Sequence, residues 1–432
     1  MAGEDAARPD DRELDAAAGR VLARLVEASH LLHPDEIGDA IAAVAQPLGV
    51  LRAQVYLADL QQRMLTALPG ADGAGAAAAP LSIDATLAGW AYRRLRMEQA
   101  TPGDGRDGYQ LWVPLVDGTE RLGVLELWVR RADDATLTLG RLLASLAGQI
   151  IGAKRSYSDM YPRMERRRPM SLQAELVWGL LPPRTFATDR VLVSAAMEPA
   201  YEVGGDAFDY ALARDRLHVS IFDSVGHDLA AGLLASVGMA SCRSTRRAGG
   251  ALPDIVTRAD QAIARQFGAE RYVTALVCDL SVTTGKLSWI PCGHPPPLLI
   301  RGNKIVKQLE RTPYPPLGLG DLPRGRPAPG HPAELWGSRS PPVYTEQLEA
   351  GDRVLLYTDG VTDGRDTHGT RFGLDRLGDF IIRNSSEGLP APETLRRLNQ
   401  EIIDYQQGRL YDDASIVLVE WMPASPRDRL TP

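Results

Sequence analysis

The sequence predicts an α+β protein in which a C-terminal two-sheet β-sandwich flanked by helices follows an N-terminal α/β domain. Three observations predict this fold class. At 432 residues the chain is too long for one ordinary hydrophobic core, so two domains are expected. The first part has the order helices, strand, helix, two strands and helix, which is typical of a sheet covered by helices. From Val191 onward, many short strands alternate with a few long helices.

The composition predicts a soluble, cytoplasmic protein. Hydrophobic residues make up 44% of the chain, and the net charge of −7 argues against a broad basic surface for nucleic acid. Residues 1–12 lack the basic start and apolar stretch of a secretory signal, and no run approaches the ~20 apolar residues of a membrane span. The three cysteines have no C-x-x-C spacing, so we expect reduced thiols rather than disulfides or a zinc site.

Residues 13–152 form the first predicted domain, after a disordered tail over residues 1–12. Apolar residues at helical spacing predict helices over 13–27, 35–45, 85–96 and 137–151. Strands are expected over 54–57, 111–115 and 123–129, and the last two are joined by a turn at Asp117-Gly118. The Gly/Ala-rich stretch over 70–80 lacks periodicity and is expected to be a loop.

Residues 153–185 change character and are predicted to link the two domains. Arginines cluster between positions 163 and 168, and a short amphipathic helix is expected over 172–181 because Pro182-Pro183 ends it. The charge run is either a solvated surface or part of an interdomain connector.

Residues 186–423 form the second predicted domain, followed by a tail over 424–432. Strands are expected over 191–197, 217–222, 274–280, 287–291, 354–357 and 414–419. Helices are expected over 229–246, 252–266 and 392–406. A turn at residues 283–286 predicts a hairpin, and the Pro/Gly-rich stretch over 311–342 is expected to be a long surface loop.

Aspartates stand at the ends of apolar strands in this second domain. Asp206 follows the paired glycines Gly204-Gly205, Asp223 and Asp359 follow apolar strands, and Asp412-Asp413 precede one. A single aspartate at a strand end is usually a turn former or a helix cap. Several of them in one domain, with few basic neighbours, fit oxygen ligands for Mg²⁺ or Mn²⁺ better, because such cations offset the repulsion between carboxylates.

Five motifs follow one another in this region. They are, in order, Glu202-Val203-Gly204-Gly205-Asp206, Asp223-x-x-Gly226-His227, Cys292-Gly293-His294-Pro295-Pro296, Thr358-Asp359-Gly360-Val361-Thr362 and Asp412-Asp413-Ala414-Ser415. Together they resemble the motifs of the SpoIIE-type PPM phosphatases, and the resemblance covers residues 190–422. The resemblance implies a two-sheet sandwich with a centre of two Mn²⁺ or Mg²⁺ ions.

The same resemblance implies roles for particular residues. Asp223 would bridge both ions, and the backbone carbonyl of Ser224 would complete one site. Asp359 and Asp412 would bind the other ion, and Asp206 would orient metal-bound water from behind the ligands. The ions, ~3.5–4 Å apart, would activate water for in-line attack on the phosphoryl group without a phospho-enzyme.

The motifs depart from the family pattern at three positions, and none of these is a predicted metal ligand. Cys292 stands where the family usually has Ala, Asp228 where it often has Gly, and Ser415 where Thr is commoner. We interpret Cys292 as a packing variant, with a nucleophilic Cys292–His294 pair as the alternative.

Two histidines and three arginines lie near the motifs. His227 is the candidate proton donor to the leaving oxygen, or it caps or packs beneath the following helix. His294 is expected to support the core. The sequence does not rank the basic residues that could hold the phosphate, which are Arg365, Arg371 and Arg409.

The first domain resembles a GAF domain in its element order and in Gly89-Trp90-Ala91-Tyr92 and Pro114-Leu115-Val116-Asp117. The resemblance implies a sensor for a small-molecule or protein signal, relayed through the helix near 170–181 to the phosphatase. A bilin is not expected because this domain has no cysteine. A homodimer is expected, with a phosphorylated STAS-type anti-sigma-factor antagonist as the substrate. The alternative function is a non-catalytic docking module.

Overall fold

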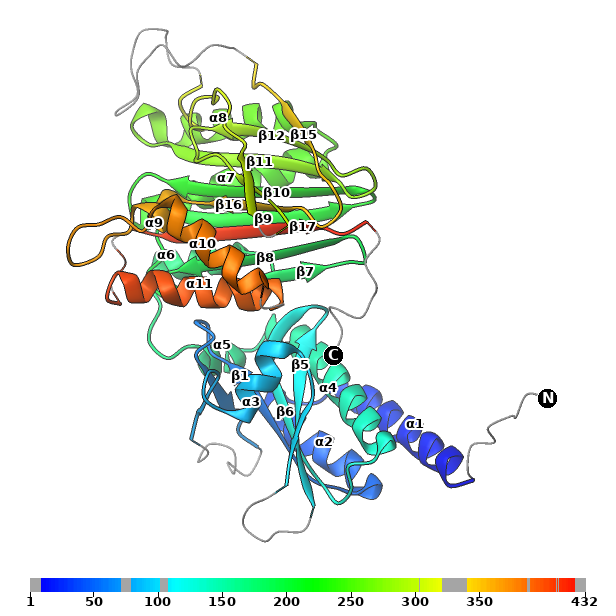
Figure 1. Cartoon of the computed structure of the whole chain (residues 1–432). Helices are drawn as coiled ribbons and strands as arrows, with labels where there is room; N and C mark the ends of the chain where they lie inside the picture. Colours follow the sequence, from blue (N-terminus) through cyan, green and yellow to red (C-terminus); the bar gives the residue numbers. More distant parts are fainter. Residues whose placement is uncertain are drawn as a thin grey trace. The chain divides into compact units, whose positions relative to one another are not determined.

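The computed structural model describes residues 9–70, 79–101, 108–302, 304–320, 340–386, 389–408, 410 and 412–423. The chain forms two compact units that divide between Arg168 and Pro169 (Figure 1). The predicted tails at 1–8 and 424–432, most of the 70–80 loop, and residues 321–339 of the 311–342 loop lie outside the described residues.

The first unit is built on a six-stranded antiparallel sheet with the order β3-β2-β1-β6-β5-β4. The strands are β1 (Val50–Ala58), β2 (Met64–Ala67), β3 (Leu81–Ser82), β4 (Glu98–Ala100), β5 (Tyr109–Asp117) and β6 (Glu120–Val129). Its three long strands each contain a predicted strand and extend beyond it, and β5 and β6 form the predicted pair around the turn. The three short strands were missed because two to four residues carry no readable alternation.

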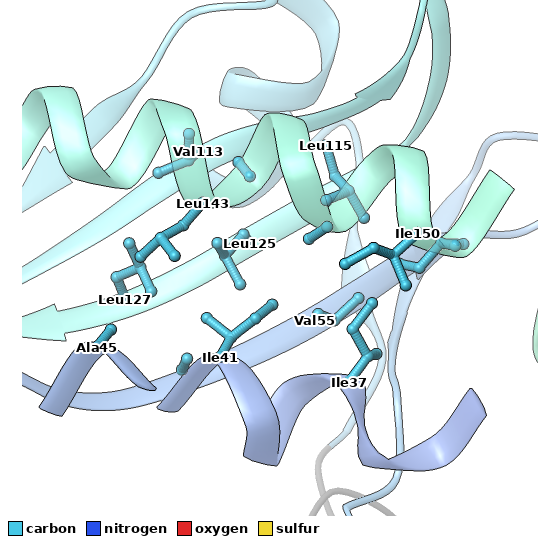
Figure 2. Close-up of a cluster of buried hydrophobic side chains, with 14 of the residues drawn as sticks. Ile37, Ile41, Ala45, Val55, Val113, Leu115, Leu125, Leu127, Leu143 and Ile150 are labelled. Carbon is cyan, nitrogen blue, oxygen red and sulfur yellow. The ribbon is translucent and has the colours of Figure 1, made fainter. Parts of the chain in front are cut away.

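Helices cover both faces of this sheet. The helices are α1 (Pro9–Ser29), α2 (Ile37–Ala45), α3 (Leu87–Arg94), α4 (Asp134–Arg155) and α5 (Met160–Glu165). Residues 9–12, expected in the disordered tail, belong to α1. Figure 2 shows side chains of α2 and α4, among them Ile41 and Leu143, packed with Val55 and Leu125 of the sheet. α3 packs on the opposite face, where Tyr92 joins a separate buried cluster.

α4 is long and apolar enough to cross a membrane, and within the described residues it is the one helix that meets this test. Leu139, Leu143, Ala147 and Ile151 of α4 are buried in the core of the first unit. This burial accounts for the apolar composition of the helix, because one of its faces is part of the hydrophobic core.

The second unit is the predicted sandwich of two antiparallel sheets. One sheet has the order β15-β12-β11-β10-β9 and the other has the order β14-β13-β16-β17-β8-β7. The first sheet contains β9 (Asp206–Ala213), β10 (Arg216–Ser224), β11 (Val273–Ser281), β12 (Lys286–Cys292) and β15 (Tyr344–Gln347). The second contains β7 (Thr185–Ala187), β8 (Val191–Glu198), β13 (Leu298–Arg301), β14 (Lys304–Gln308), β16 (Arg353–Tyr357) and β17 (Ala414–Trp421). β11 and β12 form the predicted hairpin.

Alternation along the strands divides this unit into layers. Leu217, Val219 and Ile221 of β10 point into the core between the sheets, whereas Phe222 points toward the helices. The helices of this unit are α6 (Leu172–Leu180), α7 (Leu229–Arg247), α8 (Leu252–Phe267), α9 (Asp359–Asp363), α10 (Gly373–Ser386) and α11 (Ala391–Tyr405). α7 and α8 pack on the first sheet and α11 packs on β8 of the second (Figure 1).

Two segments pack more tightly than the sequence indicated. The helix expected in the 153–185 linker, α6, belongs to the second unit, where Ala174 and Val177 are buried in the cluster beneath α7. The described start of the expected surface loop is also buried, because Tyr314 and Leu317 join the same cluster. Pro and Gly gave these residues no periodicity, so their core contacts could not be predicted from the pattern.

Candidate active site

Four stretches from distant parts of the second unit meet at one end of the sandwich. Asp223, near the end of β10, lies directly opposite Asp206, the first residue of β9. In the other sheet, β16 ends shortly before Asp359, and β17 begins directly after Asp412-Asp413. Since β16 and β17 are antiparallel neighbours, the end of one lies beside the start of the other.

An open cavity of about 620 Å³ lies at this end of the sandwich. Its wall includes five of the six residues predicted to hold the ions or to act in catalysis, which are Asp223, Ser224, His227, Asp359 and Asp412. Tyr272, Thr274 and His294 are further polar members of the wall. The described wall contains three carboxylates and no Lys or Arg, so the cavity has a negative electrostatic potential.

Asp206, the sixth predicted site residue, is buried and does not line the cavity. The Thr358 hydroxyl donates a hydrogen bond of 2.8 Å to its Oδ2. Its neighbours include two further carboxylates, those of Asp223 and Asp413. Asp206 is therefore placed to act on the site through Asp223 rather than by direct contact with a molecule in the cavity.

Asp413 is a site residue to which the sequence analysis gave no role. Its buried Oδ2 accepts hydrogen bonds from the backbone N–H groups of Gly204, Gly205 and Asp206, at 2.8, 2.6 and 3.3 Å. Asp413 thus connects the start of β17 in one sheet to the turn before β9 in the other sheet. The signal in the sequence was the pair Asp412-Asp413 directly before a strand, and of the two only Asp412 lines the described cavity.

The paired glycines Gly204 and Gly205 allow a close approach between two backbone segments. A Cβ atom on Gly204 would lie 2.6 Å from the backbone oxygen of His227. A Cβ atom on Gly205 would lie 2.6 Å from the backbone oxygen of Ser224. The turn before β9 therefore packs directly on the 224–227 loop, and no side chain larger than hydrogen fits between them.

The carboxylates at this end of the sandwich are poorly compensated. Burial raises the pKa of Asp206 well above its usual range, and repulsion from Asp223 and Asp413 raises it further. Burial does the same to the pKa of Asp223, with added repulsion from Asp359 and Asp412. Desolvation by the cavity walls also raises the pKa values of Asp359 and Asp412. Such a cluster gains stability from bound protons or cations.

The chemistry of these donors fits hard divalent cations, because the cluster offers carboxylate oxygens in an open, polar cavity. No three His, Cys, Asp or Glu side chains of the described residues converge closely enough to hold one ion. Mg²⁺ often takes only one or two carboxylates and fills its remaining positions with water and substrate oxygens. An ion here would therefore take one or two of these carboxylates and complete its coordination with other oxygen ligands.

The two motif histidines have different environments. His227 is exposed and lines the cavity, and its charge would lower the pKa of Asp412. His294 is 6% exposed, with Nδ1 2.9 Å from the Thr274 hydroxyl. Burial lowers the pKa of His294 to about 3, so this side chain is neutral near pH 7. Its position agrees with a supporting role in the wall.

Cys292 is fully buried, and burial raises the pKa of its thiol well above the usual range. A buried thiol of this kind carries no thiolate at neutral pH and is a poor nucleophile. The environment of Cys292 therefore fits the packing interpretation and not the alternative Cys292–His294 pair.

Two of the basic residues that the sequence indicated near the motifs, Arg365 and Arg371, do not line the described cavity. Arg365 donates a hydrogen bond to the backbone oxygen of Gly369, and Arg371 pairs with Asp363 at 3.1 Å. Arg409 lies outside the described residues.

Comparisons with known proteins place this unit among phosphatase sequences. Residues 213–422 match the family model described as Stage II sporulation protein E (SpoIIE). The matched region begins after Asp206, so the family model does not include the first motif. The evidence that this motif belongs to the site is structural, namely the hydrogen bonds from its backbone to Asp413.

Two curated relatives have low identity to this chain. Phosphoserine phosphatase RsbU of Bacillus subtilis is 19% identical over 296 residues, which are 68% of this chain and 82% of the relative. Protein IcfG of Synechocystis is 24% identical over 256 residues, 52% of this chain and 37% of the relative. The chain thus spans most of the first relative and little more than a third of the second.

Among solved structures, the RsbU and RsbW domains of Rv1364c from Mycobacterium tuberculosis are 23% identical to this chain, with a TM-score of 0.44. That comparison covers 55% of this chain and 63% of the solved one.

Proposed function

We propose, from the membership of residues 213–422 in the SpoIIE-type PPM phosphatases, that this protein hydrolyses phosphoserine and phosphothreonine in a phosphoprotein with two Mn²⁺ or Mg²⁺ ions. The observation that carries the proposal is the carboxylate-lined cavity at the end of the sandwich. The name of the Bacillus subtilis relative, a phosphoserine phosphatase, supports the reaction class. The proposed location is the cytoplasm.

Particular residues would hold the ions. Asp223 lines the same cavity as Asp359 and Asp412, is repelled by both carboxylates, and is the proposed shared ligand. Asp359 and Asp412 are the proposed ligands of one ion, and the Ser224 carbonyl is a proposed ligand of the other. Bound ions would supply an activated water at neutral pH and positive charge for the phosphoryl oxygens. Asp206 and Asp413 would hold Asp223 and its loop in place from behind.

His227 is the proposed proton donor to the leaving oxygen of serine or threonine. Its side chain is exposed at the cavity, where it can reach a bound substrate. We expect the pH–rate profile of His227→Ala on a phosphopeptide to lack the fall in rate at high pH that the wild type shows when its proton donor is deprotonated. An unchanged profile in this variant would eliminate His227 as the acid.

The metal-dependent reaction is tested with the full chain, p-nitrophenyl phosphate and a phosphoserine peptide, during titration with Mn²⁺ and Mg²⁺. We expect turnover that EDTA abolishes. Asp223→Asn should lower kcat/KM by more than about 100-fold, because even residues that only support a metal ligand cost 10–100-fold when removed. Full activity in excess EDTA would contradict the proposal. A folded chain that binds Mn²⁺ without turnover would favour the docking-module alternative.

The first unit is the proposed regulator of the second, and its GAF-like identity stays a prediction. We propose that a small-molecule or protein signal acts on it, in a homodimer whose substrate is a STAS-type anti-sigma-factor antagonist. The support is α6, which follows the first unit and packs beneath α7 in the phosphatase unit. If deletion of residues 1–160 left kcat, metal affinity and oligomeric state unchanged, the regulatory proposal would fail.

A further inference from the structure

An exposed ion pair between Arg271 and Asp228 lies beside the cavity, and the proposed mechanism does not use it. Asp228, which stands where the family often has glycine, accepts two hydrogen bonds from Arg271. Arg271 Nη1 lies 3.0 Å from Oδ1, and Nη2 lies 3.1 Å from Oδ2. This is the parallel, two-bond geometry that fixes the plane of a guanidinium group.

Arg271 is held next to the cavity wall by the backbone on both sides of the pair. It directly precedes Tyr272, which lines the cavity and whose carbonyl accepts the N–H of Val225 at 3.1 Å. A Cβ atom on the cavity residue Gly226 would lie 3.9 Å from Arg271 Nη1. The side chain of Arg271 is 35% exposed, so its guanidinium group is accessible from solvent at the rim.

Asp228 is itself fixed, because its Oδ1 also accepts the N–H of Ala231 and caps the first turn of α7. Arginine has five N–H donors, and the contacts described for Arg271 use two of them, both on Asp228. The pair therefore presents an oriented guanidinium group with donors left for a second oxygen-rich partner.

The described wall of the cavity offers no guanidinium group of its own. A phosphate monoester carries up to two negative charges, whereas the described cavity wall has carboxylates and no Lys or Arg. The guanidinium fork matches phosphate oxygens, which two N–H groups can bind at once. Arg365 and Arg371 are engaged elsewhere, with Gly369 and Asp363.

We propose that Arg271 binds the phosphate group of the substrate at the mouth of the cavity, and that Asp228 is the positioning residue that holds it there. This inference rests on the proposed phosphatase function and adds to it a side chain that contacts the phosphate group of the substrate. The competing explanation is an ordinary surface ion pair, which would contribute little to binding or stability.

The test compares Arg271→Ala, Arg271→Lys and Asp228→Asn in the full, Mn²⁺-loaded chain. The readouts are KM and kcat on p-nitrophenyl phosphate and on a phosphoserine peptide, and calorimetric binding of inorganic phosphate. Arg216→Ala is the matched control, because Arg216 is also exposed and paired with an aspartate, at the far end of β10 from Asp223.

We expect Arg271→Ala to weaken phosphate binding about 10- to 100-fold, as the loss of charge-assisted hydrogen bonds would. KM should rise on both substrates by more than kcat falls. Arg271→Lys should restore part of the loss, since lysine keeps the charge but not the fork. Asp228→Asn keeps an oxygen that can cap α7, so it should weaken phosphate binding less than Arg271→Ala does. When both substitutions are combined, Asp228→Asn should cause no further loss of phosphate affinity.

Three results would overturn the inference. Unchanged phosphate affinity in Arg271→Ala would show that the arginine does not bind phosphate, and an effect on the peptide alone would show that it binds acidic side chains of the substrate instead. Additive effects of Asp228→Asn and Arg271→Ala would show that Asp228 does not act through Arg271. If the wild-type chain showed no turnover, the proposed function would fail, yet calorimetry would still decide whether Arg271 binds phosphate.

Discussion

Two buried aspartates on the same strand, β9, have opposite environments. Asp206 and Asp209 are each 1% exposed and lie three residues apart on one strand, so their side chains point to opposite faces of the sheet. Asp209 pairs with Arg243 at 2.7 Å and with Arg246 at 3.0 Å, both from α7. Asp206 has two other carboxylates as neighbours, and it is stabilised by hydroxyl groups, those of Ser415 and Thr358.

This difference indicates that the Asp209 carboxylate stabilises the fold, whereas the Asp206 carboxylate supports the candidate site. A buried charge is very costly unless something compensates it. The protein supplies that compensation to Asp209, whose partner Arg243 also donates to the last carbonyl of α6, that of Leu180. At Asp206 the compensation is left to a ligand, as expected of residues that support a cation site. The comparison predicts opposite stability effects when each charge is removed.

The largest effect is expected at Asp209. Asp209→Asn should lower the free energy of unfolding by about 3 kcal/mol, because it leaves two partly buried arginines without their carboxylate. Urea unfolding of the full chain, followed by a probe of the second unit, measures this change. A loss below about 1 kcal/mol would mean that the pair behaves like a surface ion pair, and the contrast with Asp206 would fail.

Much of this fold could be predicted from sequence, because its long strands and helices have regular apolar spacing. β9 was the exception among the strands that form the site. It begins at Asp206 and carries Asp209 and Tyr210, so polar residues obscure its apolar alternation. Its ion pairs could not be predicted either, because Arg243 and Arg246 lie more than 30 residues away on α7.

The site could be predicted in part. Aspartates at strand ends carry a local signal, so Asp223, Asp359 and Asp412 could be found from the chain alone. The role of Asp413 depends on a turn more than 200 residues away, and its hydrogen bonds to Gly204 and Gly205 exist only after the two sheets pack. The Arg271–Asp228 pair likewise joins residues 43 positions apart.

The smaller effect, at Asp206, has the opposite sign. Asp206→Asn should raise the free energy of unfolding in EDTA by about 1–2 kcal/mol at pH 8, because it removes a buried charge that lacks a cationic partner. Asparagine keeps an oxygen that can accept the Thr358 hydroxyl, so the packing should survive. Activity should fall in the same variant, since the Asp206 carboxylate would no longer act on Asp223.

The pH dependence of this gain is a sharper test of the comparison. The folded-state pKa of Asp206 is raised above its usual 3.8, so the folded chain binds a proton there more tightly than the unfolded chain. The contribution of Asp206 to stability is therefore fully present below about pH 3.8 and is lost as the pH rises through the raised pKa. In EDTA the advantage of Asp206→Asn over the wild type should vanish at the acid end and grow toward pH 8. Mn²⁺ should shrink that advantage at pH 8, because a bound cation offsets the same repulsion in the wild type. An advantage that is independent of pH and Mn²⁺ would show that the substitution improves packing only, and that Asp206 is no less compensated than Asp209.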